Sequence, residues 1–518
     1  MTQSASPIPA TPTEDVNPWP ALWALVLGFF MIMVDTTIVT VATPAIIEDL
    51  DAEVNSVVWV TSAYLLAYAV PVMITGRLGD RFGPKNLYLI GMVVFTLASL
   101  WCGLTSTVEG LIIARVVQGF GTSMITPQTM AIITRIFPAD RRGQAMSLWG
   151  ATAGVALLVG PLLGGVLVDA FSWEWIFFIN IPVGIIGIAL ALRNVPSLPT
   201  HQHKFDWLGV VLSGVGMFLL VFGIQEGHQY DWGKVTGFLT VPMLIVGGIV
   251  VLVLFVLWQH YNTQEPLVPL SLFRDRNYSL ANIAISSISF TFTALGFPLM
   301  LYAQLVRGYS PTESALLMVP MALLSIVLAA PVGKLTDRVH PRYLCSVGFA
   351  TVGISLVWLS AVTTPDSAVW ELALPMGLMG AGSAAIWAPL GATATRNLPM
   401  QMAGAGSGVY NATRQVGAVL GSAAIALFMD ARLSANGLTF DPSKAPEGAS
   451  SGATLPPQAL DPFATAMGQS MLIAPAVILI GLAAVLCFAR PRGLDAAVGR
   501  GGPSDGPSRD PGPPRPTD

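Results

Sequence analysis

Long apolar stretches separated by short polar loops run through most of the chain. A helix that crosses a bilayer needs about 20 mostly apolar residues, and fourteen stretches meet this requirement. They lie at residues 20–46, 56–76, 88–107, 109–134, 143–169, 175–193, 206–225, 236–258, 279–303, 313–332, 343–363, 369–392, 403–428 and 463–489. The pattern predicts an all-α integral membrane protein with 14 transmembrane helices.

Basic residues are distributed unequally between the two sets of predicted loops. Short cytoplasmic loops retain Lys and Arg. Of the 25 such residues, 19 lie in one set of loops and the C-terminal end, four lie in the other set, and Arg115 and Arg414 fall inside helices. Because the number of helices is even, both termini lie on the same side of the membrane, and the basic residues indicate that this side is the cytoplasm. We expect the helices to lie in a bacterial inner membrane.

An internal repeat divides the chain. GRLGDRFGPK at 76–85 recurs as GKLTDRVHPR at 333–342, and ATAGVALLVG at 151–160 recurs as ATRQVGAVLG at 412–421. Both pairs have the same orientation across the membrane, which predicts a parallel repeat about an axis normal to the bilayer. We expect two pseudo-symmetric six-helix bundles at 19–198 and 263–490, with two additional linker helices at 199–262. The tails at 1–18 and 491–518 and an outer loop at 430–461 are expected to be unstructured.

Composition excludes several classes of protein. The chain is 53% hydrophobic and 10% charged, with mean hydropathy +0.66. A net charge of −4 without a long basic run argues against binding to nucleic acid. We find no GxxxxGK[ST] loop for ATP, no metal-ligating cluster and no catalytic triad pattern. We therefore expect a protein that is not an enzyme, has no cofactor and draws its energy from an ion gradient.

Two ionisable residues inside predicted helices are the main candidates for chemistry. Asp35 is the one acidic residue deep in a predicted helix. Desolvation disfavours the charged form of a carboxylate, so such a group can load and release a proton. Arg115 lies about two turns into its helix, where a cation normally has a partner. The alternatives are that Thr36 or Thr37 alone satisfies Asp35, and that Arg115 extends to the membrane surface.

Four segments carry a resemblance to a known family. They are FFMIMVDTTIVTVATPAI at 29–46, GRLGDRFGPK at 76–85, IARVVQGFGTSMITP at 113–127 and GATAGVALLVGPLLGG at 150–165. Together they resemble the major facilitator superfamily and, within it, the 14-helix drug/proton antiporters. The resemblance covers roughly residues 20 to 490. It implies that Asp35 binds the proton and that Arg115 helps to control its affinity.

The resemblance assigns a conformational latch to the first repeated segment. Its residues are Gly76, Asp80, Arg81, Gly83 and Lys85. We expect the glycines to permit a tight turn between two helices. Asp80 would then meet the positive N-terminal end of the helix that begins near Ala403 and hold the two bundles together on the cytoplasmic side. A plain basic loop without this role is the alternative.

The resemblance also implies an antiporter motif in the fifth helix, formed by Gly154, Gly160, Pro161, Gly164 and Gly165. Small residues let helices approach closely, and generic packing is the alternative role. Arg414, in GVYNATRQVGAV, is expected to have a structural or gating role, rather than to contact substrate, or to form an interfacial ion pair.

These observations predict a proton-driven exporter that alternates access by rocking two bundles. Its partners would be protons, the lipid bilayer and a small amphipathic organic substrate, with cations among the candidates, and we expect a monomer. One alternative is the same fold exporting or flipping a native lipid or lipophilic metabolite. The other is a membrane sensor or scaffold that transports nothing, which would leave the buried Asp35 and Arg115 without a purpose.

Overall fold

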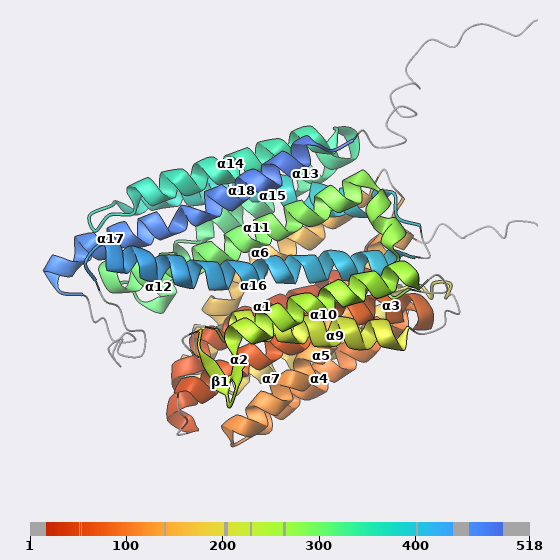
Figure 1. The fold of residues 1–518 in the computed structure, drawn as a ribbon, viewed down its shortest axis with the longest axis horizontal. Helices are drawn as coiled ribbons and strands as arrows, with labels where there is room; N and C mark the ends of the chain where they lie inside the picture. The colour runs from red at the N-terminus through yellow and green to blue at the C-terminus, as the bar shows by residue number, and fades with distance from the viewer. Residues whose placement is uncertain are drawn as a thin grey trace, which may run out of the picture.

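The computed structural model is built from roughly parallel helices that form two groups (Figure 1). It describes residues 17–50, 52, 54–138, 141–200, 206–227, 230, 232–262, 266–399, 402–438 and 455–489. Thirteen helices in this part of the chain are long and apolar enough to cross a membrane, or 14 if one bent pair counts as a single span. The predicted all-α membrane architecture is confirmed.

The first group, here called the N-terminal bundle, contains eight helical segments. They are α1 (Trp19–Asp49), α2 (Val54–Ala69), α3 (Val72–Phe82), α4 (Pro84–Leu104), α5 (Val108–Ile136), α6 (Arg142–Ala170), α7 (Trp175–Phe178) and α8 (Asn180–Asn194). α2 and α3 form the bent pair, with an angle of 45°. Pro71 precedes α3 and cannot continue the hydrogen-bond ladder of α2, which accounts for the break.

The second group, the C-terminal bundle, repeats this arrangement. It contains η1 (Leu270–Arg274), α11 (Arg276–Leu301), η2 (Tyr302–Val306), α12 (Pro311–Leu316), α13 (Val319–Arg338), α14 (Pro341–Val362), α15 (Val369–Arg396), α16 (Ala403–Ala435), α17 (Pro457–Met471) and α18 (Ile473–Leu486). The expectation of an unstructured loop at 430–461 is wrong at both ends, because α16 continues to Ala435 and α17 begins at Pro457. Residues 439–454, residues 1–16 of the tail predicted at 1–18, and the tail predicted at 491–518 lie outside the described residues.

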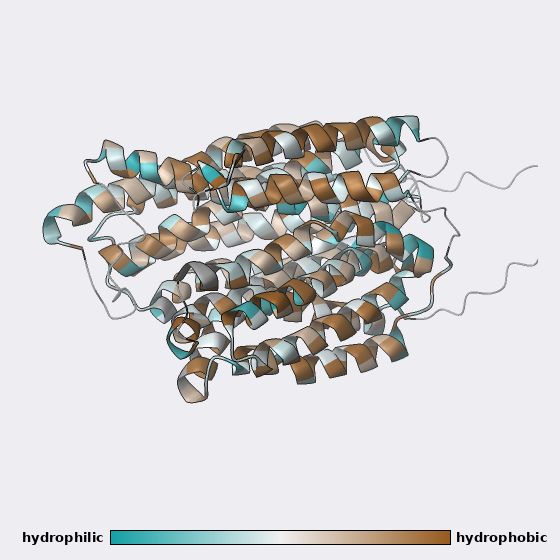
Figure 2. Ribbon diagram, turned by 60° about the horizontal axis from the view of Figure 1, so that its bottom comes forward, coloured by the Kyte–Doolittle hydropathy of each residue, from teal (hydrophilic) through white to brown (hydrophobic). Residues whose placement is uncertain are grey.

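Two helices connect the bundles. α9 (Trp207–Gln225) and α10 (Val241–Tyr261) pack on each other, and a short hairpin of β1 (Lys234–Thr236) and β2 (Leu239–Thr240) joins them. α9 contacts α2 of one bundle and α16 of the other, whereas α10 exposes most of its apolar side chains. Apolar residues cover the middle of the helices and polar residues gather toward their ends (Figure 2). The exposed apolar faces are those that a bilayer would cover.

Asp206 anchors this helix pair at one end. Its carboxylate accepts hydrogen bonds from Trp258 Nε1 and Gln259 Nε2 of α10, at 2.8 Å each, and from the backbone N–H groups of Gly209 and Leu267. Burial raises the pKa of Asp206, but these hydrogen bonds outweigh burial and hold the pKa below its usual range. One carboxylate therefore fixes α9, α10 and the start of the next segment together.

We expect Asp206→Ala to lower the free energy of unfolding by about 1–3 kcal/mol, because it leaves buried donors unpaired. Because the native pKa is depressed, the contribution of Asp206 is present at neutral pH and is lost as the pH falls through that value. Thermal unfolding of the purified protein in detergent, followed by tryptophan fluorescence, measures the change. Asp366→Ala, at an exposed turn, is the control; equal melting temperatures for the two variants would contradict the prediction.

Candidate functional site

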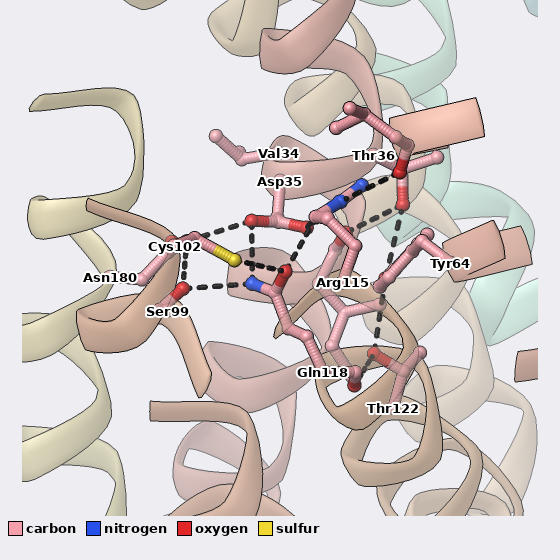
Figure 3. A network of polar contacts seen from close by, with 12 residues as sticks. Val34, Asp35, Thr36, Tyr64, Ser99, Cys102, Arg115, Gln118, Thr122 and Asn180 are labelled. Carbon is pink, nitrogen blue, oxygen red and sulfur yellow. Dashed lines mark hydrogen bonds and ion pairs between the residues drawn. The ribbon is translucent and has the colours of Figure 1, made fainter. Parts of the chain in front are cut away.

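Asp35 lies midway along α1 and is completely buried. Its Oδ2 pairs with Arg115 Nη1 at 2.6 Å. Its Oδ1 accepts hydrogen bonds from Gln118 Nε2 and Asn180 Nδ2, at 2.9 Å each (Figure 3). Three donors from α5 and α8 therefore converge on one carboxylate of α1, and their hydrogen-bonding pattern matches its ionised form.

Arg115 is also fully buried, so it does not extend to the membrane surface. Its Nε donates to the backbone oxygen of Val60 at 3.2 Å, and its Nη1 also donates to Gln118 Oε1 at 2.6 Å. The guanidinium lies 4.0 Å from the ring centroid of Tyr64, a cation–π contact. Arg115 is thus held by the carboxylate of Asp35, the amide of Gln118 and the ring of Tyr64. α2 contributes to the site through Val60 and Tyr64.

A second layer of polar groups supports the pair. Ser99 Oγ accepts from Gln118 Nε2 at 2.8 Å and from Asn180 Nδ2 at 3.0 Å. Four of these residues were not predicted from the sequence, namely Gln118, Asn180, Ser99 and Tyr64. Gln118 could have been found, since it lies one helical turn after Arg115 in the same motif. Thr36, the alternative partner of Asp35, donates to the backbone oxygen of Ile32 instead.

Glycines on one face of α6 let α1 approach closely beside this site. A Cβ atom at Gly160 would lie 1.9 Å from Thr37 Oγ1, and one at Gly164 would lie 2.9 Å from Ile38 Cγ1. Real Cβ atoms do not reach such distances. Pro161 lies between these glycines inside α6.

The other two glycines of the predicted antiporter motif face the C-terminal bundle. A Cβ atom at Gly154 would lie 3.8 Å from Ser325 Oγ, and one at Gly165 would lie 3.9 Å from Thr312 Oγ1. Both are ordinary packing distances. The motif therefore serves two contacts, with Gly160 and Gly164 against α1 and Gly154 and Gly165 against α13 and α12.

Asp80 joins the two bundles at the end of the molecule where the predicted cytoplasmic loops lie. Its Oδ1 and Oδ2 accept from the backbone N–H groups of Gly404 and Ala405, at 2.9 and 2.8 Å. These N–H groups belong to the first turn of α16, where the helix dipole favours a negative charge. Arg135 Nη2 also pairs with Asp80 Oδ1 at 2.5 Å. The structure thus contains the contact that the resemblance implied.

Other expectations for this segment need correction. Gly76 lies inside α3 and not in a turn, because the helix continues to Phe82. A Cβ atom at Gly76 would lie 2.6 Å from the backbone oxygen of Gly404, so this glycine permits close contact with α16. The turn is made by Gly83, whose φ of +91° suits glycine. Lys85 takes no part in the Asp80 contact, since its Nζ donates to the backbone oxygen of Leu192 at the end of α8. Arg81 lies over the ring of Phe82.

The second copy of the segment repeats the contact with the bundles exchanged. Asp337 of α13 accepts from the backbone N–H of Gly143, in the first turn of α6, at 2.8 Å. Arg142 reinforces this junction by donating to the backbone oxygens of Thr395 in α15 and Thr134 in α5. A carboxylate at the end of one bundle therefore meets a helix N-terminus of the other bundle twice.

Comparison with known proteins shows the family to which this chain belongs. The model of the Major Facilitator Superfamily matches residues 25–422. The chain belongs to this superfamily. It is 52% identical over 91% of its length to an uncharacterized MFS-type transporter, Rv1250, of Mycobacterium tuberculosis, and covers 81% of that protein. It is 32% identical to the tetracenomycin C resistance and export protein of Streptomyces glaucescens, over 80% of this chain and 77% of the relative.

The fold agrees with this assignment. The crystal structure of the human organic anion transporter MFSD10 superposes with a TM-score of 0.63, covering 90% of this chain and 99% of that one at 11% identity. This likeness concerns the fold alone. As a member of the Major Facilitator Superfamily, the chain is a multi-pass membrane transporter of small molecules and not an enzyme.

Arg414 is the last of the site residues predicted from the sequence of this Major Facilitator Superfamily protein. It lies in α16, and its Nη2 donates to the hydroxyl of Tyr68 in α2 at 2.9 Å. Tyr68 in turn donates to Thr126 Oγ1 of α5 at 3.2 Å. The contact crosses between the bundles, but within the described residues Arg414 has no carboxylate at ion-pair distance. The expected interfacial ion pair is therefore absent from this part of the chain.

The glycine geometry predicts different effects for two similar substitutions. Gly160→Ala must displace Thr37 and α1 and should lower the free energy of unfolding by about 1–3 kcal/mol, as overpacking usually does. Gly154→Ala, which meets ordinary packing distances, is the matched control and should leave stability almost unchanged. Melting temperatures in the same detergent test this. If Gly154→Ala were the more destabilised variant, the assignment of the two faces of α6 would be wrong.

Proposed function

We propose that this chain is a proton-driven exporter of amphipathic organic compounds that alternates access between the two sides of the membrane. The observation that carries the proposal is the fully buried Asp35, paired with Arg115 and contacted by donors from two other helices. An ionisable group at this depth is costly and usually has a function. The export activity named for the tetracenomycin C relative supports the direction and the kind of substrate.

Protonation of Asp35 provides a way to couple a proton to a helix movement. The ionised carboxylate accepts from Arg115, Gln118 and Asn180. A bound proton neutralises the charge that holds Arg115 and turns one accepting oxygen into a donor that faces other donors. At least one of the three partners must then move, and each belongs to a helix that packs against α1. Because Asp35 is fully buried, exchange of the proton also requires such a movement.

The contacts of Asp80 and Asp337 support the proposal that the bundles are closed on the cytoplasmic side. Both lie at the end of the molecule that carries the basic loops, which we assign to the cytoplasm. Opening toward the cytoplasm would withdraw Asp80 from the first turn of α16 and Asp337 from the first turn of α6. In the proposed cycle, protonation of Asp35 and binding of substrate decide when these two contacts break. We propose that one copy of the chain suffices for this cycle in a bacterial inner membrane.

The first test of this function is Asp35→Asn. The amide has almost the same shape but cannot titrate, so we expect loss of proton-coupled efflux by at least about a hundredfold with normal insertion in the membrane, since general acid–base roles contribute roughly 10²–10⁴-fold. Purified protein in liposomes, with an imposed pH gradient and a fluorescent substrate, measures both dye and proton movement.

Glu226→Gln is the matched control for this experiment. Glu226 is buried at the C-terminal end of α9, where burial raises its pKa above the usual range and a hydrogen bond with Ser62 opposes the rise. It lies far along the chain from the Asp35 pair and shares none of its partners. We expect this variant to keep most of its efflux. Proton-coupled efflux that survives in Asp35→Asn, or an equal loss in both variants, would refute the role of Asp35.

A second test addresses the cytoplasmic contact. Asp80→Asn removes the charge that faces the first turn of α16 and Arg135, so the closed cytoplasmic side should become less favourable by about 1–2 kcal/mol. Cysteine labelling at positions lining the α3 and α16 interface should become several-fold faster, and turnover should fall. Asp461→Asn, at an exposed position of α17, is the control. The same labelling rates in Asp80→Asn and wild type would show that the contact does not control the closed state.

A further inference from the structure

One face of α16 carries four polar residues that the proposed proton cycle does not use. Ser407, Tyr410, Asn411 and Arg414 follow the spacing i, i+3, i+4 and i+7, which places them on one side of a helix over two turns. We call this set the α16 polar stripe. The first three are buried, with at most 1% of each residue exposed. In a membrane helix, such a stripe faces other protein or a binding cavity and not lipid.

Every member of the stripe keeps an unsatisfied hydrogen-bonding atom. Ser407 Oγ, Tyr410 Oη, Asn411 Oδ1 and Arg414 Nε are buried and have no hydrogen-bond partner in the described part of the chain. Leaving such a buried group unpaired destabilises a fold. Four of them on one helical face argue against accidental packing and for a face that forms its hydrogen bonds with something other than this chain.

The stripe lies where the two bundles meet. Asn411 Nδ2 is 3.9 Å from the sulfur of Met130 in α5, and Arg414 bonds to Tyr68 in α2. A Cβ atom built on Gly391 of α15 would lie within 4.0 Å of the Tyr410 hydroxyl, the Met130 methyl and the sulfur of Met146 in α6. Helices α5, α6, α15 and α16 therefore converge here, two from each bundle. Opening of the bundles would expose the stripe to a molecule entering between them.

The charge of this region is positive. The carboxylate of Asp35 is neutralised by Arg115 and fully buried, so it presents no charge to the space between the bundles. The described residues contain two ion pairs, Arg115 with Asp35 and Arg135 with Asp80, and neither includes Arg414. A cation inside a membrane protein requires a partner. For Arg414 the Tyr68 hydroxyl supplies one hydrogen bond and no charge.

We propose that the α16 polar stripe binds the transported molecule and selects amphipathic anions, with a carboxylate or ionised phenol on an apolar ring system. The guanidinium of Arg414 would meet the anionic group, for which its planar fork of donors is suited. Tyr410 and Asn411 would hydrogen-bond to neighbouring polar atoms, and the flexible side chains of Met130 and Met146 would adapt to different apolar bodies. This inference rests on the proposed function and replaces the expectation that cations are among the substrates.

The test compares two dyes that share a xanthene ring system but differ in charge. Liposomes containing the full chain are given a pH gradient, and initial rates are measured for anionic carboxyfluorescein and cationic rhodamine 6G. We expect wild type to prefer carboxyfluorescein. Arg414→Gln should lower its rate by about tenfold, the scale of a lost hydrogen bond to a charged group. Arg414→Lys should retain more activity, and the rhodamine rate should not fall with either change.

Two further variants keep the test decisive. Arg432→Gln, on the same helix but over the ring of Phe428 near the helix end, is the matched control and should behave as wild type. Tyr410→Phe removes only the unpaired hydroxyl, so it should fold normally and raise the KM for carboxyfluorescein several-fold with little change in kcat. If Arg414→Gln fails to fold, the Tyr410→Phe variant still tests whether the α16 polar stripe binds substrate.

Two outcomes would overturn the inference: a wild-type preference for rhodamine 6G, or equal losses for both dyes in Arg414→Gln together with an unchanged KM in Tyr410→Phe. Asp35→Asn in the same liposomes separates this failure from that of the proposed function. If transport still depends on Asp35 while the dye preference is reversed, only the substrate class is wrong. If transport does not depend on Asp35, the proton-coupled function is wrong.

Discussion

A polar group inside a bilayer has no water to bond with, so it destabilises the fold unless it has another partner. Asp35 and Arg115 show how strongly this limits the fold. Removing one member of a buried ion pair typically costs about 3–5 kcal/mol, since the other charge stays buried without compensation. The pair therefore requires α1 and α5 to meet at one depth, Asn180 brings α8 to the same place, and Gly160 and Gly164 let α6 pack closely against another side of α1. The packing of the N-terminal bundle follows from this requirement.

The same requirement explains why the two halves are alike at their ends and different in their centres. At the end with the basic loops, Asp80 and Asp337 each satisfy the free N–H groups of a helix in the other bundle, so both copies of the segment retain the aspartate. In the centre, the N-terminal bundle contains a charge with its counter-charge, whereas Arg414 of the C-terminal bundle has no counter-charge among the residues that the structure describes. A neutral pair is suited to binding and releasing a proton, and an unbalanced cation is suited to a charged ligand. This asymmetry is the basis of the different roles that we propose for the two bundles.

Much of the fold could be predicted from the sequence, because the length of an apolar stretch and the position of basic residues reflect the bilayer directly. The approach of Asp80 to the helix that begins at Ala403 was also expected. The partners of Asp35 were harder to foresee. Asn180 lies 145 residues away and Ser99 is an ordinary serine in an apolar helix, so only the packing of α4 and α8 shows their role. Gly76 was misplaced because a glycine beside charged residues resembles a turn, although here it permits close contact between α3 and α16.

The way α9 is attached indicates how the additional helix pair behaves when the bundles move. Apolar side chains of α9 such as Met217 and Val221 lie in one cluster with Val416 and Val419 of α16 and with Ala69 of α2. Contacts of this kind have no preferred direction and can slide at little cost. Toward the N-terminal bundle, Glu226 at the end of α9 forms a hydrogen bond with Ser62 of α2, and a buried hydrogen bond of this kind resists displacement. Since the contact with α2 adds this hydrogen bond to its apolar packing, we expect α9, with α10 tied to it through Asp206, to move with the N-terminal bundle while the C-terminal bundle shifts against it.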